Sequence, residues 1–174
     1  MSERRWPGVL AFVGLTAACA AVLAGVAALT EAPIEENRAR RFEQTLTAVT
    51  GSARLAADVV WQDDLAPLCP DRALLRGTAA GYGGNIVWLA AARLGDAGPV
   101  LERVRITAHQ ETPGIADFLD RPESGWLARL PGLGSAELAA LDTVSGATIT
   151  TRALKRDLAR ALARPGLDDL ACAP

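Results

Sequence analysis

The chain has 174 residues, half of them apolar (50%), and its 18 basic and 20 acidic residues leave a net charge of −2. This length predicts one domain with appendages, and the balanced charge gives no reason to expect a nucleic-acid partner. A single histidine, His109, excludes a multi-histidine metal site, and three cysteines without a Cys-x-x-Cys pair argue against zinc or iron–sulfur sites, so we expect no metal.

The first predicted element is the apolar run Trp6–Thr30, which contains no charged residue. It exceeds the roughly 20 residues that a helix needs to cross a bilayer, so we expect a membrane anchor in contact with lipid. Arg4 and Arg5 precede the run and Glu31 follows it. The positive-inside tendency then places the N-terminus in the cytoplasm and the rest of the chain outside. The alternative is a cleaved signal peptide, whose apolar core is usually shorter, about 7–15 residues.

A helical stalk is predicted after the anchor. Pro33 suits the first turn of a helix because its missing N–H costs nothing there, and Ile34–Thr50 is rich in helix formers. We therefore expect a cytoplasmic N-terminus and transmembrane helix over 1–32, a stalk over 33–51, and a periplasmic domain over 52–174.

The exported domain begins with segments of strand character. The run 56–61 is short and 73–79 is weak, whereas 86–94 is strongly apolar and 100–109 alternates between polar and apolar residues. Gly-Asp-Ala-Gly at 95–98 separates the last two runs, which predicts a hairpin.

Helical patterns dominate the remainder of the domain. We expect a short helix at 115–119, a loop over 122–134 and a final helix over 150–163, with leucines spaced by four on one face. The fold class is therefore α+β, with a single N-terminal transmembrane helix followed by a small periplasmic domain.

The segment before the final helix, from Asp142 to Thr148, carries most functional information. Its pattern, Asp-x-x-Ser-Gly-Ala-Thr, resembles the site where a flavin transferase esterifies FMN phosphate onto a threonine hydroxyl. A helix N-terminus binds phosphate well, and Gly146 and Ala147 leave the Thr148 hydroxyl open. Asp142 would repel phosphate, so we expect the transferase to recognise it. The alternative is that Ser145 or Thr148 only caps the helix.

Two further motifs lie upstream. Gly-Tyr-Gly-Gly occupies 81–84, before a predicted strand, and His-Gln-Glu-Thr-Pro-Gly occupies 109–114, after another. The three motifs, in this order behind a membrane anchor, resemble the G subunit of the Rnf-type (Rsx) electron transport complex. They are similar, more distantly, to the C subunit of sodium-pumping NADH:quinone reductase. The resemblance extends over most of the chain.

The resemblance implies a domain that carries FMN in phosphoester linkage to Thr148. Gly83 and Gly84 would give the flavin ring close backbone access, or would only form a tight turn between strands. The implied cofactor-binding residues are Thr148, Ser145, Gly146, Ala147, Glu111, Thr112, Gly114, Gly83 and Gly84. No residue is expected to be catalytic, and His109 is expected to be a hydrogen-bonded structural residue.

Parts of the chain depart from the family pattern. The family usually continues Glu-Thr-Pro-Gly with leucine, glycine, aspartate and lysine, but the fourth position here is Phe118. The segment 122–141 is compact, with Trp126 a loose match to a family tryptophan, which predicts a more open wall at the flavin site. Cys69 and Cys172 would lie in an oxidising compartment, where a disulfide is favoured, and the family's cysteines support that pairing.

The implied function is electron relay between ferredoxin and NAD, coupled to sodium or proton movement. The partners would be the other membrane and redox subunits of an Rnf-type complex, and a flavin transferase during maturation. The chain would be a redox subunit of a translocase without complete activity alone. Two alternatives stay open: a covalent-FMN carrier of another respiratory or reductase chain, and a non-redox assembly module.

Overall fold

The structure is a computed structural model that describes residues 6–167 except for positions 69, 96 and 124. The chain divides into two compact units, residues 1–42 and 43–174. The predicted disulfide partners Cys69 and Cys172 lie outside the described residues.

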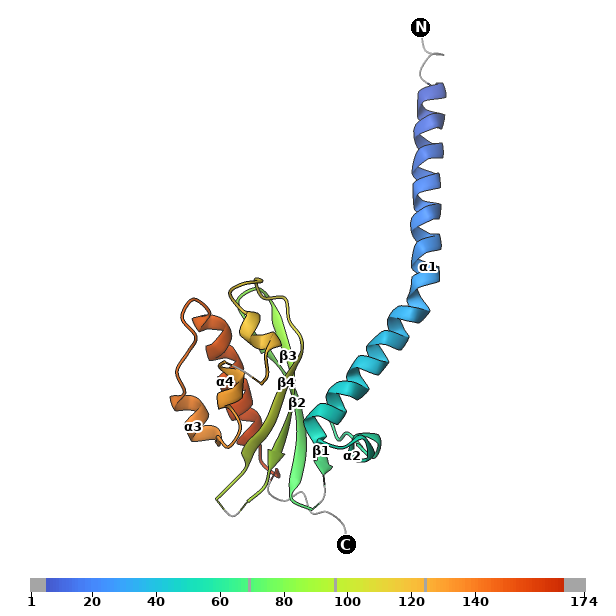
Figure 1. The fold of residues 1–174 in the computed structure, drawn as a ribbon. Helices are drawn as coiled ribbons and strands as arrows, with labels where there is room; N and C mark the ends of the chain where they lie inside the picture. The colour runs from blue at the N-terminus through green and yellow to red at the C-terminus, as the bar shows by residue number, and fades with distance from the viewer. Residues whose placement is uncertain (1–5, 69, 96, 124, 168–174) are drawn as a thin grey trace. The chain divides into compact units, whose positions relative to one another are not determined.

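Helix α1 (Trp6–Thr50) is continuous, with Pro33 in its interior (Figure 1). The stalk predicted over 33–51 continues from the apolar run as part of the same helix, which ends at Thr50. A proline removes one backbone hydrogen bond and crowds the preceding turn, but helix formers on both sides carry the helix through. Asn37 Nδ2 donates to the Pro33 carbonyl at 2.8 Å.

The N-terminal part of α1 is long and apolar enough to cross a membrane, with a mean hydropathy of 2.4 over its best window, which fits a membrane protein. The Thr30 hydroxyl donates to the Val26 carbonyl at 2.8 Å, and Thr16 makes the same kind of bond to Phe12. Both hydroxyls are thus satisfied within the helix, as hydrocarbon surroundings require. A cleaved signal sequence would meet the same length and composition test.

A four-stranded antiparallel sheet of order β1-β2-β3-β4 forms the domain (Figure 1). Its strands are β1 (Leu65–Leu68), β2 (Arg72–Ala80), β3 (Asn85–Arg93) and β4 (Val100–Ala108). The three longer strands and the β3–β4 hairpin confirm the predicted runs. The predicted strand at 56–61 is wrong, because helix α2 (Ala53–Ala57) forms there, capped by Ser52. The sequence pattern missed β1, an edge strand that tolerates Pro67.

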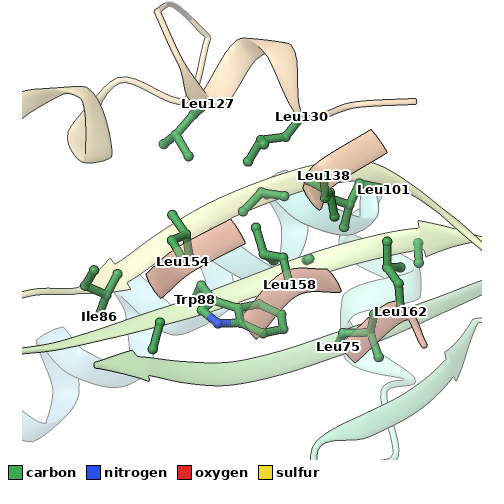
Figure 2. Close-up of a cluster of buried hydrophobic side chains, with 14 of the residues drawn as sticks. Leu75, Ile86, Trp88, Leu101, Leu127, Leu130, Leu138, Leu154, Leu158 and Leu162 are labelled. Carbon is green, nitrogen blue, oxygen red and sulfur yellow. The ribbon is translucent and has the colours of Figure 1, made fainter. Parts of the chain in front are cut away.

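Both faces of the sheet are covered. Helix α4 (Thr148–Leu162) packs Leu154, Leu158 and Leu162 over Trp88 and its neighbours on one face (Figure 2). Leu46 and Val49, from the last turns of α1, pack with apolar residues of the other face. Successive strand residues point to opposite faces, and this is why β3 reads as a continuous apolar run.

Short helical segments cover the end of the core near α4. They are the 3₁₀ turns η1 (Asp117–Asp120) and η2 (Leu127–Arg129) and the helix α3 (Ser135–Ala140). The helix expected at 115–119 is the single turn η1, and α3 was not expected. Leu127, Leu130 and Leu138 from these segments are buried above α4 (Figure 2). The α+β class is confirmed.

Candidate functional site

The Ser-Gly-Ala-Thr motif forms a tight turn that leads directly into α4. The Ala147 N–H donates to the Val144 carbonyl at 3.0 Å, and Gly146, the third residue of the turn, has φ of +82°. This left-handed conformation is typical of the third residue of a type II turn and favours glycine. The turn ends where the helix begins, so Thr148 is the first residue of α4.

The N-terminus of α4 is open. Its N-cap is Ala147, with no side-chain hydrogen bond to the first turn, so the interpretation of Ser145 or Thr148 as a helix cap is wrong. The first intrahelical bond runs from the Thr151 N–H to the Ala147 carbonyl at 2.9 Å. The earlier N–H groups of the helix have no intrahelical partner, and together with the helix dipole they form a site that attracts anions.

The Glu-Thr-Pro-Gly motif forms a second turn, over 112–115. The Ile115 N–H donates to the Thr112 carbonyl at 3.3 Å, and Gly114, with φ of +85°, again occupies the third position. Proline at the second position and glycine at the third are the residues that a type II turn prefers. The Gly114 N–H donates to Asp117 Oδ1 at 2.6 Å, which ties the turn to η1.

The two motifs meet at an open pocket of about 270 Å³. Its walls come from the β2–β3 turn, the 111–115 segment and the first turn of α4. The lining residues are Tyr82, Glu111, Thr112, Ile115, Gly146, Ala147, Thr148, Ile149 and Thr150.

Three large apolar side chains at this pocket are unusually exposed for their type, since Tyr82 is 74% exposed, Ile115 54% and Ile149 55%. Sequence reasoning did not single them out as site residues. Clustered exposed apolar side chains around a concave site are a mark of ligand binding, and their positions within or beside the motifs were the available signal.

Glu111 is a polar residue that lines the pocket. Its Oε1 accepts a hydrogen bond from the Gly83 N–H at 2.9 Å, and its Oε2 accepts one from the Thr150 hydroxyl at 2.6 Å. The side chain is only 7% exposed. One carboxylate therefore joins the β2–β3 turn, the second motif and α4.

The glycines at 81–84 form a tight turn, closed by a bond from the Gly81 N–H to the Gly84 carbonyl at 2.9 Å. A Cβ on Gly83 would lie 2.4 Å from the Gln110 carbonyl oxygen, and one on Gly84 would lie 2.7 Å from Gln110 Oε1. These two glycines let the turn pack against the second motif, and they do not line the pocket.

His109 is hydrogen-bonded at both ring nitrogens. The Glu111 N–H donates to Nδ1 at 3.3 Å. Because Nδ1 accepts, Nε2 is the ring nitrogen that can donate, and it lies 3.2 Å from Asp120 Oδ1. This arrangement holds the second motif beside η1 and fits the expected structural role.

The loop before the Ser-Gly-Ala-Thr motif is fixed by hydrogen bonds from the residues that pack against it. Trp126 Nε1 donates to the Asp142 carbonyl at 2.7 Å, and Lys155 Nζ donates to the carbonyl of Ala139 at 2.9 Å. The Asp142 side chain is 86% exposed and lies 3.6 Å from an Arg129 nitrogen, and it does not line the pocket.

The structure thus brings together most of the predicted site. The predicted residues that line the pocket are Thr148, Gly146, Ala147, Glu111 and Thr112. Those that lie in the adjoining turns, outside the lining, are Ser145, Gly114, Gly83 and Gly84.

Comparison with known proteins assigns this region. Residues 81–163 match the FMN-binding domain family, a range that includes all three motifs. The chain is similar to the G subunit of the ion-translocating oxidoreductase complex of Stutzerimonas stutzeri, with 36% identity over 96 residues that cover 49% of this chain and 41% of the relative.

Proteins with the same name from two other bacteria are also similar. The identity is 40% over 84 residues for Shewanella baltica (strain OS223), covering 42% of this chain and 38% of the relative. It is 31% over 103 residues for Buchnera aphidicola subsp. Acyrthosiphon pisum (strain APS), covering 52% and 61%. The chain thus spans less than two thirds of the length of these relatives. Residues 81–163 therefore resemble FMN-binding domains, and over part of its length the chain is similar to proteins named as G subunits of ion-translocating oxidoreductase complexes.

Proposed function

We propose that Thr148 carries FMN in phosphoester linkage and that the chain relays electrons as a subunit of an ion-translocating oxidoreductase complex. The observation that carries the proposal is the position of Thr148. Its side chain lines the pocket at the uncapped N-terminus of α4, inside the region that matches the FMN-binding domain family.

The residues around Thr148 fit a phosphate group. The unpaired N–H groups at the start of α4 can donate to phosphate oxygens, and the helix dipole favours the negative charge. Gly146 has open space where a Cβ would lie, so the turn leaves room for the group. The Thr150 and Thr151 hydroxyls are already bonded, to Glu111 and to the Ala147 carbonyl, which leaves Thr148 as the available hydroxyl in the first turn of α4.

The apolar side chains at the pocket fit the flavin ring. Tyr82, Ile115 and Ile149 would be covered by a flat aromatic group that extends from the phosphate site. Burial of their exposed apolar surface would favour binding. When bound, FMN supplies the electron-carrying chemistry, and the protein positions it and limits its contact with water.

Asp142 suits recognition by the enzyme that installs the flavin. Its exposed carboxylate lies just outside the pocket, where a second protein can reach it. The Asp142 carboxylate would repel a bound phosphate, because both groups are negatively charged. We therefore propose that the transferase recognises Asp142 and that this residue is not a flavin ligand.

The cellular setting is also part of the proposal. The apolar part of α1 would anchor the chain in the bacterial inner membrane, with the domain in the periplasm. Covalent attachment would then prevent loss of FMN where no pool replaces it. As the names of the relatives indicate, its partners would be the other subunits of the complex. The resemblance to Rnf-type complexes implies that these subunits pass electrons between ferredoxin and NAD.

Intact-mass measurement tests the attachment. The full chain, produced with a flavin transferase in the proposed compartment, should gain the mass of one FMN less one water. Thr148→Ala should abolish this gain, whereas Thr112→Ala, which removes another hydroxyl of the pocket, should retain it. An unmodified wild-type chain under these conditions would refute covalent attachment and favour the assembly-module alternative.

A further inference from the structure

The Glu111 carboxylate has a role that the attachment motif alone does not reveal. It reaches two segments far apart in the chain, because its partners Gly83 and Thr150 lie 28 and 39 residues away in sequence. We propose that Glu111 is a positioning residue: it fixes the first turn of α4, and so the Thr148 hydroxyl, and its charge makes the nearby flavin harder to reduce. The inference rests on the proposed attachment of FMN to Thr148.

Hydrogen bonds satisfy both oxygens of the buried Glu111 side chain. Both oxygens accept, one from a backbone N–H that can only donate and one from the Thr150 hydroxyl. A carboxylate at 7% exposure would be costly to bury without such donors. The adjacent N-terminal turn of α4 also favours a negative charge.

Thr150 is the third residue of α4, and the residue four positions earlier, Gly146, lies before the helix with a φ of +82°. A threonine inside a helix commonly donates to the carbonyl one turn earlier, and the neighbouring Thr151 does so, to the Ala147 carbonyl at 2.8 Å. Thr150 instead donates across to Glu111, although it is only 2% exposed. Its hydroxyl therefore ties α4 to the second motif.

The β2–β3 turn is shaped around the same carboxylate. A Cβ on Gly81 would lie 2.2 Å from Glu111 Oε1, and one on Gly83 would lie 3.2 Å from the Glu111 Cα. Because the turn, Glu111 and Thr150 are held together, the first turn of α4 has little freedom to rotate. Thr148, two residues before Thr150, then presents its hydroxyl and the free N–H groups to the pocket.

The charge of Glu111 has a separate effect. It lines the pocket in which the flavin would lie. Electron uptake adds negative charge to the flavin, and a fixed carboxylate nearby opposes it. Protein groups close to a cofactor tune its potential in this way.

Two substitutions separate position from charge. Thr150→Val keeps the shape and the Glu111 charge but removes the hydroxyl that joins α4 to Glu111. Glu111→Gln removes the charge, while its amide can accept from Gly83 and donate to the Thr150 oxygen. Thr150→Ser restores the hydroxyl, and Glu43→Gln, at an exposed position, is the matched control for loss of one carboxylate.

The experiment uses the full chain in detergent. We expect Thr150→Val to slow FMN attachment by a flavin transferase about tenfold, in line with loss of a hydrogen bond to a charged group. It should also speed amide hydrogen exchange in peptides covering 81–85 and 148–152. Thr150→Ser should restore both readouts. In the flavinylated proteins, Glu111→Gln should shift the potential to more positive values, and Glu43→Gln should leave it near the wild-type value.

Attachment and exchange at wild-type rates in Thr150→Val would overturn the positioning role. An unchanged potential in Glu111→Gln would overturn the charge effect. If the wild-type chain takes no FMN, the proposed function fails instead, and the exchange measurement on the unmodified chain still decides whether Thr150 and Glu111 hold the first turn of α4.

Discussion

Gly81→Ala tests the packing of the β2–β3 turn against Glu111. The added Cβ would lie 2.2 Å from Glu111 Oε1 and 2.9 Å from Ile86 Cδ1, so both side chains would have to move. Ile86, on β3, is fully buried in the core that also contains the leucines of α4, and it has little room to shift. The displacement therefore falls mainly on Glu111, whose carboxylate loses the Gly83 N–H, the Thr150 hydroxyl or both.

The expected loss of stability follows from those two bonds. A hydrogen bond to a charged group contributes about 1.5–3 kcal/mol. Alanine in place of glycine returns about 0.4–1 kcal/mol through the unfolded state. The net decrease in the free energy of unfolding should be about 0.5–2.6 kcal/mol if one bond is lost, and about 2–5.6 kcal/mol if both are lost.

Urea denaturation of the full chain in detergent, followed by tryptophan fluorescence, measures this change, since Trp88 and Trp126 are both buried. Gly95→Ala is the matched control, because no atom lies within 4 Å of its added Cβ. The reasoning is refuted if Gly81→Ala unfolds at the same urea concentration as Gly95→Ala.

Three further substitutions test other parts of the domain. Gly77→Ala places a Cβ 2.3 Å from Trp88 Cζ2 and should destabilise by about 1–3 kcal/mol through overpacking; an unchanged urea midpoint would contradict this close packing. Leu158→Ala, on the buried face of α4, should lower the free energy of unfolding by about 2–5 kcal/mol in the same assay. A smaller decrease would mean that neighbouring side chains fill the cavity. Gly146→Ala forces a side chain into φ of +82°, at about 1–2 kcal/mol, and should slow FMN attachment in a timed intact-mass assay; attachment at the wild-type rate would show that the turn opens before modification.

Local patterns in the sequence predicted much of this fold. The spacing of Leu154, Leu158 and Leu162 identifies the buried face of α4, because residues four apart lie on one side of a helix. The glycines at 95 and 98 mark the β3–β4 hairpin in the same way. Both features depend on neighbours in the chain, so a single sequence contains them.

Other features depend on contacts between distant segments. Strand β1, which contains Pro67, is stabilised by pairing with β2 and by burial of Leu65, Ala66 and Leu68 in the core. No residue near Glu111 in the sequence indicates that its side chain bonds Gly83 and Thr150. It was predicted as a flavin contact only because the motif resembles that of a known family. The exposed side chain of Ile149 also gains meaning only when the pocket beside it is known.

The compact segment 122–141 departs from the family pattern, and the structure changes what that departure means. Among the described residues, none that lines the pocket comes from this segment. Trp126 is instead buried, packs edge-to-face on Phe118 with ring centroids 5.9 Å apart, and bonds the Asp142 carbonyl.

The segment therefore stabilises the loop before Thr148, through the Trp126 bond to the Asp142 carbonyl. Phe118, at the position of the family's lysine, contributes by packing on Trp126. Because no described residue of this segment lines the pocket, a change here would alter the surface beside Asp142, where a transferase would dock, more than the pocket. With FMN on Thr148 as proposed, substitutions in this segment should change the rate of attachment more than the potential of the attached flavin.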